Sequence, residues 1–352
     1  MVTGVHISGK NNEQSLLFVA IKKIAANKPS DSFIIFTDKN VKNLSSNCTQ
    51  IIISPAPKNR LLLYYWYSYK LPKLLLKYGI TVFVTEAGML AASANIKQYL
   101  FFSNTFFKND KNVFFKRKTF AALKSSEKIF VADEHIADLL VEKYAADADK
   151  IKSLYFDLPA KKLNLSWNEI EKNKETYAEG FDYFLFNVSK DSCKQIITVL
   201  KSFSQFKKWQ KSSMKMVLLL DNINEENLIA DFKNYKYRNE VKIIIQTEQN
   251  ILPIIASAFT AVFFGSYIDV PFVFTALQNN IAVIAGDTKT NNLLFKNTVM
   301  YSDVSENELA QKMQLLYKDE LQKNALIQQS ASLPEKYNTV NASLKLFQLI
   351  TC

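Results

Sequence analysis

Residues 127–159 read EKIFVADEHIADLLVEKYAADADKIKSLYFDLP and contain one complete repeat of the fold. The runs 129–132 and 151–155 are short and rich in β-branched or aromatic residues, which is typical of buried strands. Between them, residues 136–144 place apolar side chains at helical spacing. A strand, a helix and a second strand in this order predict two parallel strands joined by a helix.

The same alternation of short apolar runs and amphipathic stretches continues along the whole chain. The runs are apolar on both faces, which is the pattern of parallel strands covered by helices on both sides. We therefore predict a doubly wound α/β architecture. The other expected strands are 33–37, 50–54, 82–85, 99–103, 183–188, 216–220, 241–246, 261–264, 282–285 and 298–301. The other expected helices include 13–26, 65–78, 193–209 and 306–317.

A polar stretch near residues 158–180, LPAKKLNLSWNEIEKNKETYAEG, divides these elements into two groups. A chain of 352 residues corresponds to about two domains at roughly 150 residues each. We interpret the stretch as a linker and one helix between two Rossmann-like domains. The expected domains are residues 1–160 and 161–340, and a C-terminal helix in residues 341–352 is expected to cross back to the first domain.

The composition excludes several classes of protein. Only 7 residues are glycine, far below the usual fraction of about 7%, and neither a G-x-G-x-x-G nor a P-loop motif occurs. The three cysteines are isolated and the chain has two histidines, so we expect no metal site and no disulfide framework. No signal peptide or apolar run of about 18 residues occurs, so we expect a cytoplasmic protein.

Positive charge is concentrated in one part of the chain. The net charge is +11, and residues 58–124 contain 12 basic residues against only Glu86 and Asp110. Aromatic residues at 64–67 and 69 lie within this stretch. They are interpreted either as a packed helix face or as anchors at the inner face of an anionic membrane. No nucleic-acid recognition motif accompanies the charge, so we expect no nucleic-acid partner.

Several segments, taken together, resemble a known family. They are SDSFIIFTDKN (30–40), YYWYSYKLPKLLLKYGITVFVTEAG (64–88), the segment 127–159, FDYFLFNVSKDSCKQIITVLKSFSQFKK (181–208) and FTAVFFGSYIDVPFVFTALQNNIAVIAGD (259–287). Their order and spacing resemble the GT-B glycosyltransferases, specifically the large retaining family 4, over almost the whole chain. The resemblance implies two Rossmann-like domains, the first for the acceptor and the second for a nucleotide-sugar donor. It implies no other cofactor.

The resemblance assigns four residues to the donor side. Lys194 matches the family's phosphate-binding lysine, and Lys190 stands near the position of a second basic residue. Ser266 lies in the segment that holds the donor sugar, and Thr275 aligns with a glutamate that normally binds the nucleotide ribose. A threonine can form one such hydrogen bond but cannot act as a charged acceptor.

Acceptor-side and catalytic candidates follow in the same way. Glu86 ends an expected strand on the side where α/β sheets bind ligands. Ser103, with Phe102, replaces the family's His-Asp at another strand end. Glu134 matches a family glutamate, and Asp269 aligns near the first of two glutamates in the sugar-holding segment. Glu134 and Asp269 are therefore the catalytic candidates.

Two functions remain open at this point. The first is a retaining transferase of the hexosyltransferase type that moves a sugar from a nucleotide-sugar to a surface-glycan or lipid-linked acceptor, as in polysaccharide biosynthesis. Because several family residues are replaced, its activity is expected to be weak. The second is a catalytically silent relative that binds a partner or a glycan.

Overall fold

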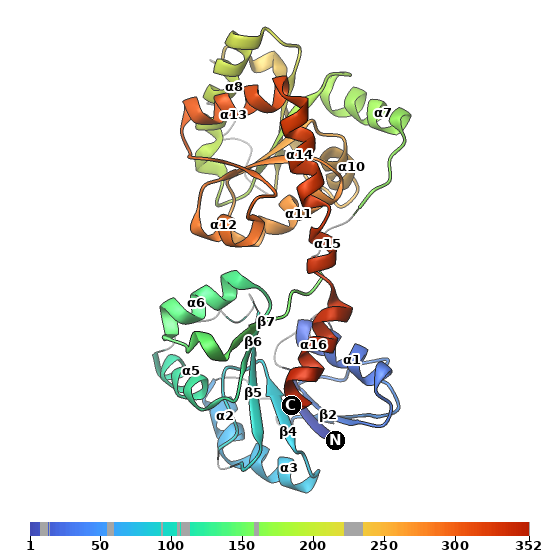
Figure 1. Ribbon diagram of the computed structural model, residues 1–352, viewed down its shortest axis with the longest axis vertical. Coiled ribbons are helices and arrows are strands. Elements are labelled where there is room, and N and C mark those ends of the chain that lie inside the picture. The colour runs from blue at the N-terminus through green and yellow to red at the C-terminus, as the bar shows by residue number, and fades with distance from the viewer. Residues whose placement is uncertain are drawn as a thin grey trace. The chain divides into compact units, whose positions relative to one another are not determined.

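The computed structural model describes residues 1–7, 13, 15–54, 60–92, 94–103, 106, 113–157, 162–221 and 235–351 (Figure 1). The chain forms two compact units, which we call unit 1 (Met1–Phe156 with Tyr337–Cys352) and unit 2 (Asp157–Lys336). The expected boundary between residues 160 and 161 lies outside the described residues.

Unit 1 is built on a seven-stranded parallel sheet with the order β3-β2-β1-β4-β5-β6-β7. Its strands are β1 (Val2–Ile7), β2 (Ser32–Thr37), β3 (Cys48–Ile52), β4 (Val82–Thr85), β5 (Lys97–Phe102), β6 (Ile129–Val131) and β7 (Ile151–Ser153). The strand β1 is absent from the sequence predictions because Gly4 and His6 interrupt its apolar pattern. Gly4 fits closely there, since a Cβ atom would lie 2.8 Å from the end of the Ile80 side chain.

Helices cover both faces of this sheet. One buried cluster joins the sheet to α1 and α16, which contact each other (Figure 1). A second cluster joins the other face to the continuous run of α2, η2 and α3, in which η2 is a π-helix. The helical elements are α1 (Leu16–Asn27), α2 (Arg60–Tyr65), η2 (Trp66–Lys70), α3 (Leu71–Lys77), α5 (Val113–Ser125), α6 (Glu134–Tyr144), η3 (Ala148–Lys150) and α16 (Thr339–Thr351).

Unit 2 is built on a six-stranded parallel sheet with the order β10-β9-β8-β11-β12-β13. Its strands are β8 (Tyr183–Val188), β9 (Lys215–Leu220), β10 (Val241–Ile245), β11 (Thr260–Phe263), β12 (Ala282–Gly286) and β13 (Met300–Ser302). Every residue of β8, β9, β11 and β12 is buried. This confirms the sequence interpretation that apolar runs without alternation are interior strands of a doubly wound sheet.

The helices of unit 2 follow the strands in the expected alternation. Helices α8 and α13 pack against each other over one buried cluster. The helical elements are α7 (Trp167–Ala178), η4 (Cys193–Gln195), α8 (Ile196–Gln210), η5 (Arg238–Glu240), α10 (Ile251–Ala256), η6 (Tyr267–Asp269), α11 (Val270–Gln278), α12 (Lys289–Phe295), α13 (Glu306–Lys318), α14 (Glu320–Ser330) and α15 (Leu333–Lys336). The two sheets and their helices together confirm the predicted α/β class.

Candidate functional site

Each sheet has one point at which the strand order reverses direction. In unit 1 this point lies between β1 and β4, and in unit 2 it lies between β8 and β11. Chain segments leave the sheet in opposite directions there, so a crevice opens beyond the carboxyl ends of the two strands, and open α/β sheets bind ligands in this crevice. The residues that follow these strands are therefore the candidate site residues of each unit.

In unit 2, Asp269 ties together the loops that follow β8 and β11. Its Oδ2 accepts a hydrogen bond from the Ser189 hydroxyl at 2.8 Å and another from the Ser266 backbone N–H at 3.0 Å. Gly265 makes room for this carboxylate, because a Cβ atom at Gly265 would lie 2.6 Å from Oδ2. The carboxylate therefore links the loops at the carboxyl ends of β8 and β11, at the reversal point of the sheet.

The predicted donor lysines lie in a tight turn between β8 and α8. The Ser189 N–H donates to the Ser192 hydroxyl at 2.8 Å, and the Cys193 N–H donates to the Ser189 carbonyl at 2.9 Å. Both serines are buried, whereas Lys190 and Lys194 are exposed. The turn thus presents two cations just before a 15-residue helix, at the end where the helix dipole favours anions. Sequence reasoning found the lysines and missed the serines that shape the turn.

Thr275, the predicted ribose-binding residue, lies inside α11. Its side chain is largely buried, and its hydroxyl donates to the Pro271 carbonyl at 2.8 Å. The Thr275 hydroxyl therefore already donates its hydrogen bond inside α11. Val270 and Phe272, in the same helix, are buried as well.

In unit 1, Glu86 lies at the reversal point between β1 and β4. The Ser15 hydroxyl donates to its Oε2 at 2.6 Å, and the same hydroxyl oxygen accepts from the Phe18 N–H as the N-cap of α1. The predicted acceptor-side carboxylate is therefore held against the start of the first helix of the sheet. The sequence showed Glu86 at a strand end but not its partner 71 positions away.

A buried polar network connects η2 with β1 and β4, the two strands that flank the reversal point. The His6 Nδ1 is 2.6 Å from the Tyr67 hydroxyl, which is 2.5 Å from the Thr85 hydroxyl. Burial lowers the pKa of His6 to about 3 and raises the pKa of Tyr67 well above its usual range, because desolvation disfavours the charged form of each group. His6 is therefore a neutral structural residue, and the network joins β1, η2 and β4.

The ends of β5 and β6 carry the other predicted residues of unit 1. Phe102 is fully buried and packs edge-on against Phe106, whereas Ser103 is half-buried. Glu86, Ser103 and Glu134 follow the neighbouring strands β4, β5 and β6, respectively. They therefore lie at the carboxyl ends of these strands.

Glu134 begins α6, immediately after Asp133, whose side chain caps the helix by accepting from the Ile136 N–H at 3.0 Å. The Tyr155 hydroxyl donates to Glu134 Oε1 at 2.5 Å. Burial and the neighbouring Glu134 raise the pKa of Tyr155, which stays a hydrogen-bond donor. The backbone of Tyr155 has a φ of 52°, an unfavourable value for an aromatic residue.

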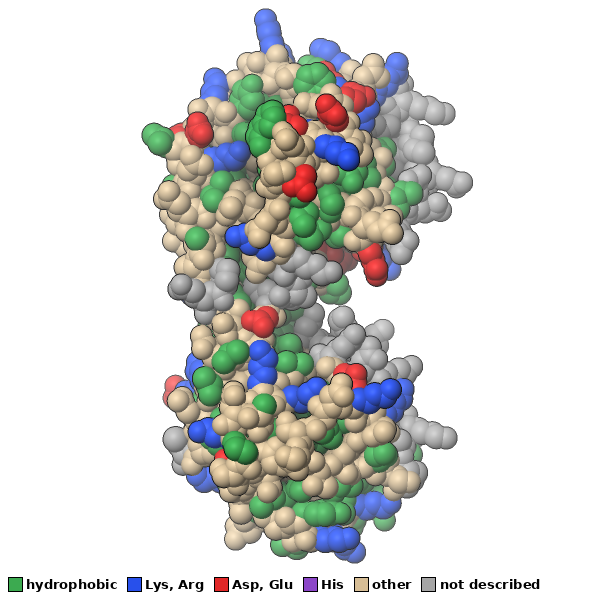
Figure 2. Space-filling view, turned by 90° about the vertical axis from the view of Figure 1, so that its right-hand side faces the viewer, with side chains coloured by type: hydrophobic (Ala, Val, Ile, Leu, Met, Phe, Trp, Pro, Cys, Tyr) green, Lys and Arg blue, Asp and Glu red, His purple; other side chains and the backbone are tan. Residues whose placement is uncertain are grey.

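Acidic and basic side chains are distributed differently over the two units. On the face shown in Figure 2, basic side chains lie on both units, and acidic ones gather mainly over unit 2.

Among the described residues there is no group of three or more His, Cys, Asp or Glu side chains that could hold a metal ion. In the part of the chain that the structure describes, no helix is long and apolar enough to span a membrane.

Comparison with known proteins places this architecture in a structural class. No protein-family model and no curated protein sequence matches the chain. Solved structures match it over its whole length. A glycosyltransferase from Rickettsia africae has a TM-score of 0.63 and 15% identity, with 99% of this chain and 97% of the other covered. The similarity at this level of identity is one of fold, which is GT-B with two Rossmann-like units.

Two further structures show the same similarity. HepE from Anabaena, solved in complex with UDP, has a TM-score of 0.65 and 11% identity, with 99% of each chain covered. WaaG, a glycosyltransferase involved in lipopolysaccharide biosynthesis, has a TM-score of 0.58 and 11% identity, with both chains covered completely.

Proposed function

We propose that this protein transfers a sugar from a nucleotide-sugar donor to a glycan or lipid-linked acceptor, with retention of configuration and at a low rate. One observation carries the proposal: in a GT-B fold, the reversal point of unit 2 presents Lys190 and Lys194 on a built turn at a helix N-terminus. Among the matching structures, HepE was solved with UDP and with UDP-glucose. That fact supports a nucleotide-sugar as the donor.

The residues of unit 2 suit the leaving diphosphate. A retaining transfer builds negative charge on the diphosphate while the sugar becomes oxocarbenium-like, so fixed positive charge near the phosphates lowers the barrier. Lys194 is the first residue we assign to this task, and Lys190 is the second. Both are point charges and lack the paired donors of an arginine, so they hold the phosphates with less geometric precision.

The low rate follows from side chains that are engaged in the fold. The Asp269 carboxylate accepts two hydrogen bonds from Ser189 and Ser266, and the Thr275 hydroxyl donates within α11. At the end of β5, the buried ring of Phe102 cannot exchange a proton. In this proposal Glu134 of unit 1 is the catalytic carboxylate that remains, although its Oε1 also accepts a hydrogen bond from the Tyr155 hydroxyl.

The acceptor is proposed to be reached at the inner face of the cell membrane. Along the run from α2 to α3, exposed apolar side chains share the surface with three exposed lysines. Leu76 is 82% exposed, and Lys70, Lys73 and Lys77 are exposed beside it. The other exposed apolar residues of this run are Leu61, Leu62, Tyr65 and Tyr69. A helix with this surface binds anionic membranes through apolar insertion and charge attraction.

A second candidate function is supported by the same engaged side chains. If Asp269 and Thr275 serve only the fold, unit 2 binds a nucleotide without turning it over, and the protein acts as a silent glycan- or partner-binding relative. In this case the basic turn keeps its affinity for diphosphates, while the transfer step is lost.

A two-part experiment separates the two functions. Calorimetry with UDP and a set of nucleotide sugars measures binding, and incubation with lipid-linked acceptors measures transfer. Slow transfer with retained configuration is the expected result. Binding without transfer supports the silent protein instead, and the absence of both contradicts a donor site in unit 2.

A further inference from the structure

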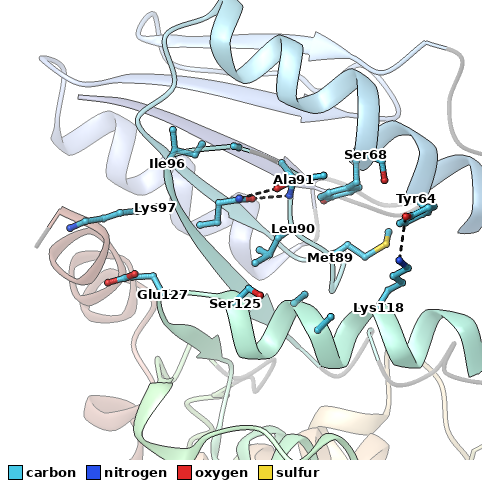
Figure 3. Close-up of a pocket in the computed structure, with 16 residues that line it drawn as sticks. Tyr64, Ser68, Met89, Leu90, Ala91, Ile96, Lys97, Lys118, Ser125 and Glu127 are labelled. Carbon is cyan, nitrogen blue, oxygen red and sulfur yellow. Dashed lines mark hydrogen bonds between the residues drawn. The ribbon is translucent and has the colours of Figure 1, made fainter.

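Unit 1 contains a cavity whose lining does not include Glu86, Ser103 or Glu134, although Tyr67 of the buried network forms part of its wall. The chain passes from β4 to β5 through residues 86–96, and the described residues 86–92 and 94–96 form no helix. Parallel strands are usually joined through a helix that covers the sheet. Here an extended loop runs between η2 and α5, and a cavity of about 510 Å³ lies beside it (Figure 3). This volume is within the usual range of small-molecule sites, about 300–1,000 Å³.

The wall of the cavity is fixed by specific hydrogen bonds. The Gln98 side chain accepts from the Ala91 N–H at 2.8 Å and donates to the Ala91 carbonyl at 3.1 Å. On the other side, the Ala92 N–H donates to the Tyr67 carbonyl in the π-helix at 3.2 Å. The loop is thus bonded both to β5 and to η2, so the cavity is formed before a ligand arrives, which reduces the entropy lost on binding.

One end of the cavity carries a fixed cation beside two hydroxyl groups. Lys118 Nζ is 3.2 Å from the Tyr64 hydroxyl and 4.4 Å from the centre of the Tyr64 ring. Ser68 follows Tyr64 by four residues and lines this part of the cavity as well (Figure 3), and hydrogen bonding to Ser68 and Lys118 lowers the pKa of Tyr64. Figure 3 shows Tyr64 and Lys118 facing each other at this end.

Charge and apolar surface are arranged along the cavity in a definite order. Helix α5 has the sequence VFFKRKTFAALKS, with four basic residues and no acidic one. Met89 and Leu90 line the cavity between the Lys118 end and the opposite end, where Lys97 and Glu127 lie (Figure 3). The cavity therefore offers oxyanion donors at one end and apolar contact next to them.

We propose that this cavity binds an amphiphile with a phosphate head group, with the phosphate at Lys118, Tyr64 and Ser68 and the apolar chain along Met89 and Leu90. A phosphate oxygen gains charge-assisted hydrogen bonds from an ammonium group and two hydroxyls. This site does not depend on glycosyl transfer, and its occupancy can be measured without a nucleotide sugar. In the continuous run of α2 and η2, Tyr64 and Ser68 are each followed by an exposed tyrosine, Tyr65 and Tyr69, so the site lies beside the proposed membrane-binding surface.

Calorimetry with three probes tests the class of ligand. The probes are dihexanoyl phosphatidic acid below its micelle concentration, inorganic phosphate, and hexyl glucoside as a neutral amphiphile of similar chain length. We expect the phosphatidic acid to bind at least about tenfold more tightly than either other probe. It alone has both a phosphate for the Lys118 end and an apolar chain for Met89 and Leu90. Equal affinity for inorganic phosphate or for hexyl glucoside would overturn the proposed class.

Variants test the location. Lys118→Ala is expected to weaken phosphatidic acid binding by about tenfold or more, whereas Lys124→Ala, which removes an exposed lysine of the same helix outside the cavity, changes it less than about twofold. Ala121→Trp and Ser125→Phe replace exposed residues of the cavity wall and are expected to block binding while circular dichroism stays native. Equal losses in the two lysine variants, or full binding in a folded blocking variant, would show that the ligand binds elsewhere.

Discussion

Replacing Asp269 by alanine should destabilise unit 2, because the side chain joins two strands that are far apart in sequence. Asp269 Oδ2 accepts from Ser189 and from the Ser266 N–H. A hydrogen bond to a charged group is worth about 1.5–3 kcal/mol, and a capping interaction about 1 kcal/mol. Ser189 keeps a second contact with the Ser192 hydroxyl at 3.3 Å, which reduces the loss. We therefore expect Asp269→Ala to lower the free energy of unfolding by about 2–4 kcal/mol.

Two further variants divide this loss into its parts. Asp269→Asn keeps one oxygen as a neutral acceptor, and neutral hydrogen bonds are about half as strong as charged ones, so we expect a loss of about 1 kcal/mol. Ser189→Ala removes the bond between the β8 and β11 loops together with the weaker contact to Ser192, and we expect about 1 kcal/mol as well. For a domain of this size, about 1 kcal/mol corresponds to about 2–4 °C in Tm.

Urea denaturation and scanning calorimetry of the same variants measure the effect. Glu248→Ala is the control, since it removes one negative charge of unit 2 at an exposed position and should change the free energy by less than about 0.5 kcal/mol. If Asp269→Ala is no more destabilising than Glu248→Ala, the carboxylate does not stabilise the loops that follow β8 and β11. Its hydrogen bonds to these loops then cannot explain slow transfer.

Three other predictions concern single groups. Lys194→Ala should weaken UDP binding by about 10–100-fold in calorimetry, while Lys208→Ala, at the far end of α8, should leave it unchanged; equal effects would make Lys194 an ordinary surface lysine. The folded-state pKa of His6 is lowered to about 3, below the unfolded value of about 6.5, so stability should fall as pH decreases through this window, by up to about 1.4 kcal/mol per unit. In urea titrations His6→Gln should flatten this dependence, and an unchanged slope would assign it to other groups. Tyr155→Phe removes the hydrogen bond to Glu134 and should lower the free energy of unfolding by about 1–3 kcal/mol; an unchanged Tm would show that the bond is not formed in solution.

The sequence predicts the fold well because buried parallel strands leave a local signal. Apolar runs such as Tyr183–Val188 and Lys215–Leu220 lie in the sheet almost as expected. The strand β1 escapes prediction because tertiary packing, not local preference, explains its composition. Gly4 packs against Ile80, and His6 is hydrogen-bonded to Tyr67, which is 61 residues away in the sequence. Neither reason is visible in a window of neighbouring residues.

The contacts of the candidate site residues are not predictable from the sequence. A strand end pointed to Glu86, whereas Glu134 and Lys194 were assigned by the resemblance to a family, and both follow strands of the two sheets. The partners of these residues cannot be read in this way. Ser15 lies 71 residues from Glu86, and Ser189 lies 80 residues from Asp269. Whether a carboxylate is engaged in the fold therefore becomes apparent only in three dimensions.

Helix α16 has a consequence for how the chain is made. Its residues Leu346 and Ile350 are buried in the same cluster as Phe18 and Ile21 of α1. A ribosome synthesises α16 only after all of Asp157–Lys336, which takes about 10–35 s at about 5–20 residues per second. During this time α1 covers one face of the first sheet without α16, so apolar side chains that α16 would bury are exposed to chaperones and to other nascent chains. The unit whose synthesis begins first thus receives its last helix only at the end of synthesis.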